Sequence, residues 1–245
     1  YLLDRKQSMN GCAKKRFENY KQQPLEFVFD KSFTGKLSQF GLDPNRRTPS
    51  GIKAAIIREK GTNGEREMAY MLYLAGFDVK DVTMTDLISG RETLEDINMV
   101  VYCGGFSNSD VLGSAKGWAG SFLFNPKAKA ALDNFYARED TLSLGVCNGC
   151  QLMMELGLIT PEDKKKGKML HNDSHKFESN FLGVTVPMNR SVMFGSLSGS
   201  KLGIWVAHGE GKFSLPYPED HYNVVLKYSY DEYPGNPNGS DYSVA

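Results

Sequence analysis

One stretch of the chain, residues 141–154, presents a cysteine in the setting of a catalytic nucleophile. The apolar residues before this cysteine alternate as one face of a buried strand would: Leu142, Leu144 and Val146. Gly145 and Gly149 permit close backbone approach and unusual φ, and an amphipathic helical pattern follows them. Cys147 therefore lies in a tight strand-to-helix turn, where unpaired helix N–H groups favour a thiolate. This pattern is that of a nucleophile elbow and predicts that Cys147 is the nucleophile.

A thiolate that attacks a carbonyl group needs hydrogen-bond donors aimed at the oxyanion that develops. Gly104 and Gly105 follow another predicted strand and leave their N–H groups uncovered by side chains, and the N–H of Asn148 directly follows the nucleophile. Sites in open α/β sheets form beyond the carboxyl ends of the strands, so we expect these donors to meet Cys147 there. Taken alone, the glycine pair is also typical of a simple turn.

A second group of candidate residues follows Ala207. His208 and Glu210 are two positions apart, so on an extended strand they point to the same side. A Cys–His–Glu triad would need a histidine near the sulfur and a carboxylate that orients it. The same spacing is typical of a solvated strand end, and the residues alone leave both interpretations open.

Two other chemistries use the same cysteines. Cys147 and Cys150 form a Cys-x-x-Cys pair, but a redox pair of the thioredoxin kind belongs early in a βαβ pattern, and this pair follows several such units. His171 and His175 would complete a zinc-like pattern. Residues 151–170 separate the two pairs, which is longer than the usual spacing of about 12–15 residues. We predict neither a redox pair nor a metal site.

Composition narrows the classes of function. The chain has 245 residues and 40% apolar residues, which is enough for one large domain with a core, or a domain plus a tail. Its 29 basic and 29 acidic residues balance without a basic stripe, which argues against nucleic acid or a membrane as partner. It contains no apolar run of transmembrane length and no signal-peptide pattern, and four cysteines do not make a disulfide framework. We expect a cytoplasmic location.

The elements around these residues follow an alternating order. Residues 1–24 are polar with a helical pattern, and residues 30–51 are rich in turn-forming residues, as a linker would be. The pattern then predicts strands at 53–57, 77–82, 98–103 and 142–146, with helices at 65–76, 114–124, 126–137 and 148–156. Thr62 and Glu65 have the spacing of a capping box. Short alternating runs after His175 predict antiparallel strands at 183–187, 203–207 and 223–228.

This order predicts the fold class. Strands that alternate with helices favour a doubly wound (flavodoxin-like) α/β fold with a mostly parallel sheet, and the last third adds an antiparallel section.

Together the motifs resemble a known family, the glutamine amidotransferase domain of the large single-chain phosphoribosylformylglycinamidine synthases of purine biosynthesis. The resemblance extends from about Ala54 to Ser240. Its most specific stretches are Gly113-Ser-Ala-Lys-Gly-Trp-Ala119 and Cys147-Asn-Gly-Cys-Gln151. Further matching stretches are residues 59–68, 74–77, 81–84, 104–107, 143–152, 207–211 and 233–240.

The resemblance implies an activity and a set of site residues. Such domains hydrolyse glutamine through a cysteine thioester, matched here by Cys147, and pass ammonia to a synthase domain that uses ATP, Mg²⁺ and formylglycinamide ribonucleotide. No cofactor is implied in the amidotransferase domain itself. The residues matching the oxyanion-hole and glutamine-binding motifs are Gly104, Gly105, Phe106, Asn148, Gln151, His208, Gly209 and Glu210. The implied organisation is a synthase tail (1–29), a linker (30–51) and the amidotransferase domain (52–245).

One departure from the family affects the assignment of the triad. The family carries its catalytic His and Glu in a His-Pro-Glu motif beyond the Asn236–Ser240 stretch, and this sequence has no such motif before Ala245. We therefore expect a domain that lacks its C-terminal end and is a poor glutaminase alone, with His208 and Glu210 binding substrate. The alternative is a catalytically incomplete module for docking and ammonia routing. The intact Cys147 turn favours the enzyme.

Overall fold

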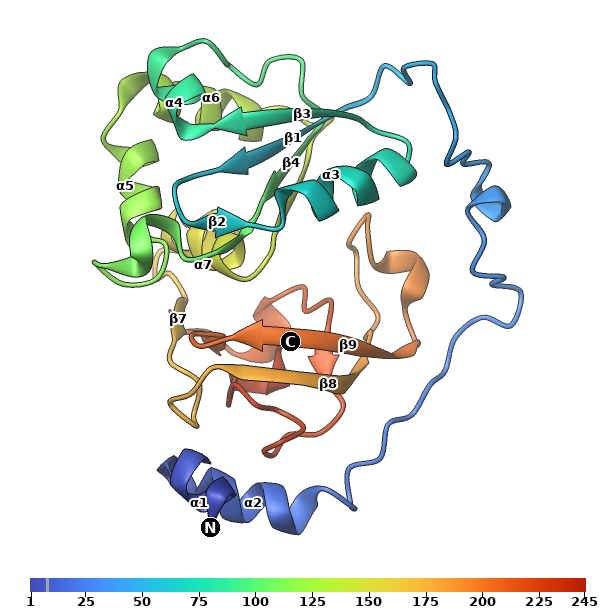
Figure 1. Cartoon of the computed structure of the whole chain (residues 1–245), viewed down its shortest axis with the longest axis vertical. Helices are drawn as coiled ribbons and strands as arrows, with labels where there is room; N and C mark the ends of the chain where they lie inside the picture. Colours follow the sequence, from blue (N-terminus) through green and yellow to red (C-terminus); the bar gives the residue numbers. More distant parts are fainter. Residues whose placement is uncertain (8) are drawn as a thin grey trace. The chain divides into compact units, whose positions relative to one another are not determined.

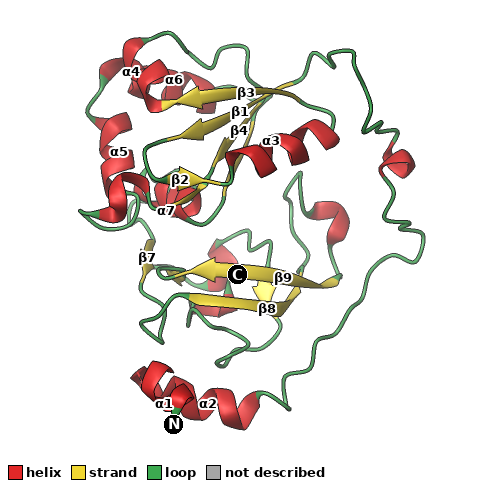
Figure 2. Cartoon of the chain, viewed as in Figure 1, coloured by secondary structure: helices red, strands yellow, loops and turns green. Residues whose placement is uncertain are grey.

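The computed structural model describes residues 1–7 and 9–245 and contains two compact units (Figures 1 and 2). One unit comprises residues 34–161, and the other combines residues 1–33 with residues 162–245. Each unit has its own sheets and is described separately below.

The sheet of the 34–161 unit contains four parallel strands in the order β3–β1–β4–β6. They are β1 (Lys53–Arg58), β3 (Asp78–Thr83), β4 (Met99–Tyr102) and β6 (Leu142–Gly145). All four run in the same direction, so their carboxyl ends lie at one edge, with Tyr102 opposite Gly145. This sheet confirms the predicted doubly wound α/β class.

Helices cover both faces of this sheet, and the strand residues alternate between the two cores, as the two-residue period of a strand requires. Helix α3 (Glu65–Leu74) packs through Leu72 on the face formed by Ala54, Ile56, Met99 and Val101. The helices that share the core of the opposite face are α4 (Met84–Ser89), α5 (Lys116–Leu123), α6 (Pro126–Tyr136) and α7 (Asn148–Glu155). Trp118 and Phe122 pack edge-to-face on Tyr102 there.

The predicted capping box at Thr62 is wrong. Thr62 lies in the short strand β2 (Thr62–Asn63), which pairs with β5 (Gly104–Gly105), and α3 begins after Gly64 without a side-chain cap. Because its backbone pairs with β5, Thr62 does not serve as the N-cap of α3, and Gly64 occupies that position. A capping box does form at Thr83 and Asp86, at the start of α4.

The other unit confirms the predicted antiparallel section. Its three-stranded sheet has the order β11–β8–β9, formed by β8 (Glu178–Thr185), β9 (Lys201–His208) and β11 (Lys227–Tyr228). A second antiparallel pair joins β7 (Lys168–Leu170) to β10 (Lys212–Ser214). The core of the larger sheet consists of Val184, Val206 and Tyr228.

The first residues of the chain belong to the same unit. Helix α1 (Leu2–Gln7) is followed by η1 (Met9–Gly11) and α2 (Cys12–Asn19), and Val28 pairs with Lys201 beside β9. The remaining short 3-10 turns are η2 (Leu37–Phe40), η3 (Ser107–Asp110), η4 (Gly195–Leu197), η5 (Glu219–His221) and η6 (Asp241–Ser243).

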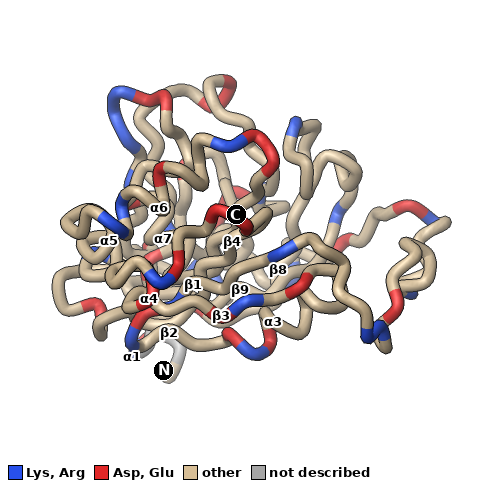
Figure 3. Tube along the Cα trace, turned by 90° about the horizontal axis from the view of Figure 1, so that it is seen from above, with Lys and Arg blue, Asp and Glu red and all other residues tan. Residues whose placement is uncertain are grey.

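Charged residues of both signs are interspersed along the chain trace (Figure 3), in keeping with the balanced composition. Among the helices of residues 1–7 and 9–245, none is both long and apolar enough to cross a membrane.

Candidate active site around Cys147

Cys147 lies in the turn between β6 and α7, and its backbone is strained. It has φ 51° and ψ −110°, which places a non-glycine residue outside the well-populated regions. Such a conformation costs of order 1–3 kcal/mol and is typical of functional sites. The sequence placed the unusual φ at the flanking glycines, whereas the structure places it at the cysteine itself, and the glycines serve close approach.

Gly145 and Gly149, on either side of Cys147, are required because other backbone segments lie very close to them. A Cβ atom at Gly149 would lie 2.1 Å from the carbonyl oxygen of Tyr102, and one at Gly145 would lie 2.6 Å from the oxygen of Gly149. Both separations are far below van der Waals contact. The first turn of α7 can therefore lie against the ends of β4 and β6 only because these positions have no side chain.

Two backbone N–H groups act on the thiol of Cys147. They belong to Gly105, in β5, and to Asn148, the first residue of α7, and both lower the pKa of the thiol. Gly104 also lies close, since a Cβ atom there would be 3.3 Å from Cys147 Cβ. The structure thus brings together four of the sequence-predicted residues at the carboxyl edge of the sheet.

The electrostatics of the thiol are set by opposing effects. Burial raises the pKa of Cys147 above its ordinary value and is the largest effect, while the two N–H groups lower the pKa and Asp110 raises it. The sequence predicted that helix N–H groups would favour the thiolate. They do act in that direction, but desolvation outweighs them. Burial also raises the pKa of Cys150, to about 12.

Gly105 is held in place by the short β2–β5 pairing. It lies opposite Thr62 with φ 116°, and a Cβ atom there would be 2.7 Å from Thr62 Cα. The following N–H, from Phe106, donates to the oxygen of Gly61 at 2.9 Å, and the Phe106 side chain is exposed. Gly105 thus occupies a position that only glycine fits, which explains its place in the motif.

The side chain of Asn148 links α7 to the loop that follows β5. It is fully buried, its Oδ1 accepts from the N–H of Ser107 at 3.0 Å, and its Nδ2 donates to Asp110 Oδ1 at 3.2 Å. Nδ2 also donates to Gln151 Oε1 at 2.9 Å. The sequence motif predicted a role for Gln151, whereas the supporting roles of Ser107 and Asp110 appear only in the structure. No local pattern marks them, because their roles arise from the path of the loop after β5.

His208 and Glu210 belong to the other unit, residues 1–33 and 162–245. His208 ends β9, and its Nδ1 lies 3.1 Å from Oδ1 of the fully buried Asn172. Asn172 Nδ2 donates to the oxygens of His208 and Lys176, which identifies Oδ1 as the acceptor and places the imidazole hydrogen on Nδ1. Burial lowers the pKa of His208. The neutral ring therefore offers Nε2 as an acceptor.

The turn after His208 is fixed by further buried contacts. A Cβ atom at Gly211 would lie 2.5 Å from His208 Nδ1, so the ring requires a glycine at this position. Gly209 accepts from the N–H of Asn172 at 3.0 Å, and Glu210 Oε1 lies 3.6 Å from Nδ1 of His171. Asn238, from the motif at 233–240, donates to the oxygen of Gly211 at 2.7 Å. Two motifs that are distant in sequence thus form one structure.

The residues of the zinc-like pattern lie in different units, Cys147 and Cys150 in one, His171 and His175 in the other. The two histidine rings stack at 5.9 Å. Within the described part of the chain, no group of three or more His, Cys, Asp or Glu side chains is arranged to hold a metal ion.

Comparisons with known proteins bear on both the Cys147 turn and the His208 turn. The family model of the CobB/CobQ-like glutamine amidotransferase domain matches residues 51–245. Phosphoribosylformylglycinamidine synthase of Drosophila melanogaster is 37% identical, and the match covers 100% of this chain and 19% of that protein. The Homo sapiens protein of the same name is 42% identical over 81% of this chain and 17% of its own length. The chain thus spans less than a fifth of these relatives.

A solved structure agrees with the sequence relatives. The structure of PurLQS from Thermotoga maritima superposes with a TM-score of 0.61 at 28% identity, covering 79% of this chain and 80% of that chain.

Proposed function

We propose, from the premise that this chain belongs to the CobB/CobQ-like glutamine amidotransferase family, that Cys147 is the nucleophile of glutamine hydrolysis. Its sulfur attacks the carboxamide carbon of glutamine, and the collapse of the tetrahedral intermediate forms a γ-glutamyl thioester. The thiol proton leaves with the amide nitrogen as ammonia. Water then cleaves the thioester, which gives glutamate and regenerates the thiol.

One observation carries this proposal, namely that the N–H groups of Gly105 and Asn148 both act on the Cys147 thiol and lower its pKa. An oxyanion on the carbon bonded to that sulfur would lie within reach of the same two donors. Donors held by strand pairing and by a helix N-terminus need no reorganisation when the charge develops. The strained backbone at Cys147 keeps the sulfur beside them.

The relatives suggest a role for the whole protein. We infer that the ammonia serves ATP-dependent amidination of formylglycinamide ribonucleotide by a synthase portion of the same polypeptide, which would hold ATP and Mg²⁺. Residues 1–29 would be the tail of that portion, 30–51 a linker and 52–245 the amidotransferase domain. Glutamine is the proposed small-molecule partner, with neither nucleic acid nor a membrane involved. The free thiols at all four cysteines suit the cytosol.

Labelling with a diazoketone analogue of glutamine tests the function. We expect intact-mass analysis to show one adduct, which peptide mapping places on Cys147, and glutamine should slow its formation. Asparagine, one methylene shorter, should protect much less and serves as the matched control. Labelling that glutamine does not slow, or that falls on Cys150 or Cys103 instead, would contradict the proposal.

We assign His208 and Glu210 to glutamine binding rather than to the triad, because the neutral His208 ring offers Nε2 as a hydrogen-bond acceptor. Replacing His208 with alanine should raise the analogue concentration for half-maximal labelling about tenfold, the value of one good hydrogen bond. The maximal labelling rate should stay within about twofold. The matched control is His175→Ala on the exposed loop nearby. Labelling abolished even at saturating analogue would place His208 in the triad.

A further inference from the structure

A buried carboxylate lies directly opposite His208. Glu178, the first residue of β8, is 1% exposed and pairs in register with His208 at the end of β9. Residues paired in this way project from the same face of a sheet, with Cβ atoms about 4.5–5.5 Å apart. Burying a carboxylate without a compensating charge costs free energy. The groups that compensate Glu178 therefore also belong to the surroundings of His208, which lies opposite it.

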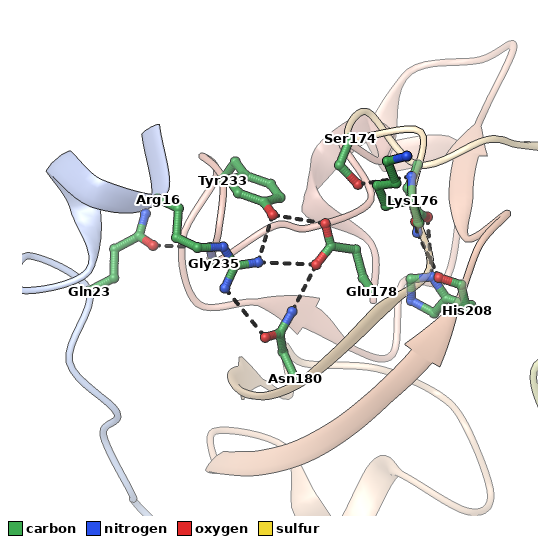
Figure 4. A network of polar contacts seen from close by, with 10 residues as sticks. Arg16, Gln23, Ser174, Lys176, Glu178, Asn180, His208, Tyr233 and Gly235 are labelled. Atoms are coloured by element: carbon green, nitrogen blue, oxygen red, sulfur yellow. Dashed lines mark hydrogen bonds and ion pairs between the residues drawn. The ribbon is translucent and has the colours of Figure 1, made fainter. Parts of the chain in front are cut away.

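Arg16 supplies the compensating charge from helix α2, as Figure 4 shows. Its Nη2 lies 3.1 Å from Glu178 Oε2 and also donates to the hydroxyl of Tyr233 at 2.6 Å. Tyr233 in turn donates to Glu178 Oε1 at 2.8 Å, and Asn180 donates to Oε2 at 2.9 Å. The guanidinium carbon lies 5.0 Å from the centroid of the Tyr233 ring. Both carboxylate oxygens are thereby hydrogen-bonded.

Helix α2 is held in a specific position by further polar contacts. Asn19 Nδ2 donates to the oxygen of Tyr233 at 2.7 Å. Gln23 donates to the oxygen of Glu232 at 3.1 Å and accepts from the N–H of Gly235 at 3.0 Å. These contacts hold α2 and the segment after it against residues 232–235. Arg16 is thereby kept beside Glu178.

The charge of Glu178 reaches the ring of His208. Burial lowers the pKa of His208, and the Glu178 charge acts in the opposite direction. Asn172 holds Nδ1 from the preceding loop, and Gly211 packs on the ring from the following turn. Asn172 and Gly211 thus fix the ring, and the charge of Glu178, which Arg16 compensates, forms part of its environment.

We propose that Arg16 is a positioning residue that acts on His208 through Glu178: it neutralises and orients the buried Glu178 carboxylate, which pairs with His208 across β8 and β9. The role of His208 in glutamine binding rests on the function proposed above. Arg16 precedes residues 51–245, the part that matches the amidotransferase family. Docking of α2 would thus set glutamine affinity, and its displacement would leave Glu178 unpaired and disturb the glutamine site.

The experiment compares variants of the Arg16–Glu178 pair in the whole chain. Arg16→Gln leaves Glu178 charged and buried, whereas Arg16→Gln combined with Glu178→Gln removes that charge. Lys14→Gln is the matched control, because Lys14 lies on the same helix in an exposed pair with Glu18. Circular dichroism confirms that each variant is folded, and Arg16→Lys keeps the charge should Arg16→Gln fail to fold.

The first measurement is the NMR signal of the His208 ring, which is tractable because the chain has only four histidines. We expect Arg16→Gln to shift this signal, the double variant to return it toward its original position, and Lys14→Gln to leave it unchanged. The second is the analogue concentration for half-maximal labelling of Cys147, which Arg16→Gln should raise about tenfold with the maximal rate preserved.

Each outcome separates this proposal from the proposed function. An unchanged His208 signal and an unchanged half-maximal concentration in Arg16→Gln would overturn the positioning role. A double variant as impaired as Arg16→Gln would show that packing, rather than the charge on Glu178, matters, and would also overturn it. If glutamine fails to protect Cys147 in the unmodified chain, the proposed function fails, while the NMR signal still decides whether Arg16 positions His208.

Discussion

Replacing Cys147 with alanine is expected to abolish both the adduct with the glutamine analogue and glutamine hydrolysis. The loss should be on the order of 10⁴-fold or more, as for removal of a covalent nucleophile elsewhere. The sulfur is the atom on which the N–H groups of Gly105 and Asn148 act, and a methyl group cannot form the thioester. Ammonia release and intact mass measure the two effects.

The labelling rate of Cys147 should also depend on pH in a defined direction. Burial raises the pKa of this thiol, so the reactive thiolate fraction is small at neutral pH and grows as the pH rises toward that pKa. We expect the rate to increase steadily between about pH 7 and pH 9.

The matched control for Cys147→Ala is Cys150→Ala. Burial raises the pKa of Cys150 to about 12, so it contributes almost no thiolate, and its loss should leave the adduct on Cys147. An adduct that persists in Cys147→Ala and vanishes in Cys150→Ala would show that the nucleophile has been misassigned.

Replacing Gly149 with alanine should destabilise the protein by about 3 kcal/mol or more, at the upper end of the cost of overpacking. The new Cβ atom would lie 2.1 Å from the oxygen and 2.6 Å from the carbonyl carbon of Tyr102, and both belong to the backbone of β4. A backbone cannot rotate away as a flexible side chain can, so α7 must move from the sheet. Urea unfolding measures the free-energy change, and displacement of Cys147 should slow its labelling in the same variant.

Gly120→Ala provides the control for this substitution, since Gly120 is also a helical glycine in the same unit. A Cβ atom there would meet Phe124 at 3.7 Å, an ordinary contact. Alanine is favoured over glycine within a helix by about 0.8–1 kcal/mol, so Gly120→Ala should be neutral or stabilising. If Gly149→Ala unfolded within about 0.5 kcal/mol of the unmodified chain, the tight packing of the Cys147 turn would be refuted.

The sequence by itself determined the elements whose signals are local. The apolar runs at 53–57 and 98–103 predicted β1 and β4, and both strands were confirmed. The glycines around Cys147 indicated a tight strand-to-helix turn, because few residue types can occupy positions where backbones touch. The parallel class followed from the order of the elements. Each of these inferences needs only neighbouring residues and the period of a strand or helix.

Only the tertiary structure decided features that depend on distant partners. Thr62 forms a strand with Gly105 instead of capping a helix, because the pairing satisfies backbone groups that a local motif cannot reach. The pKa of Cys147 rises because desolvation depends on everything packed around the thiol. Arg16 meets Glu178 across 162 residues of sequence. Burial and long-range contacts are properties of the folded chain, and no pattern within a short window encodes them.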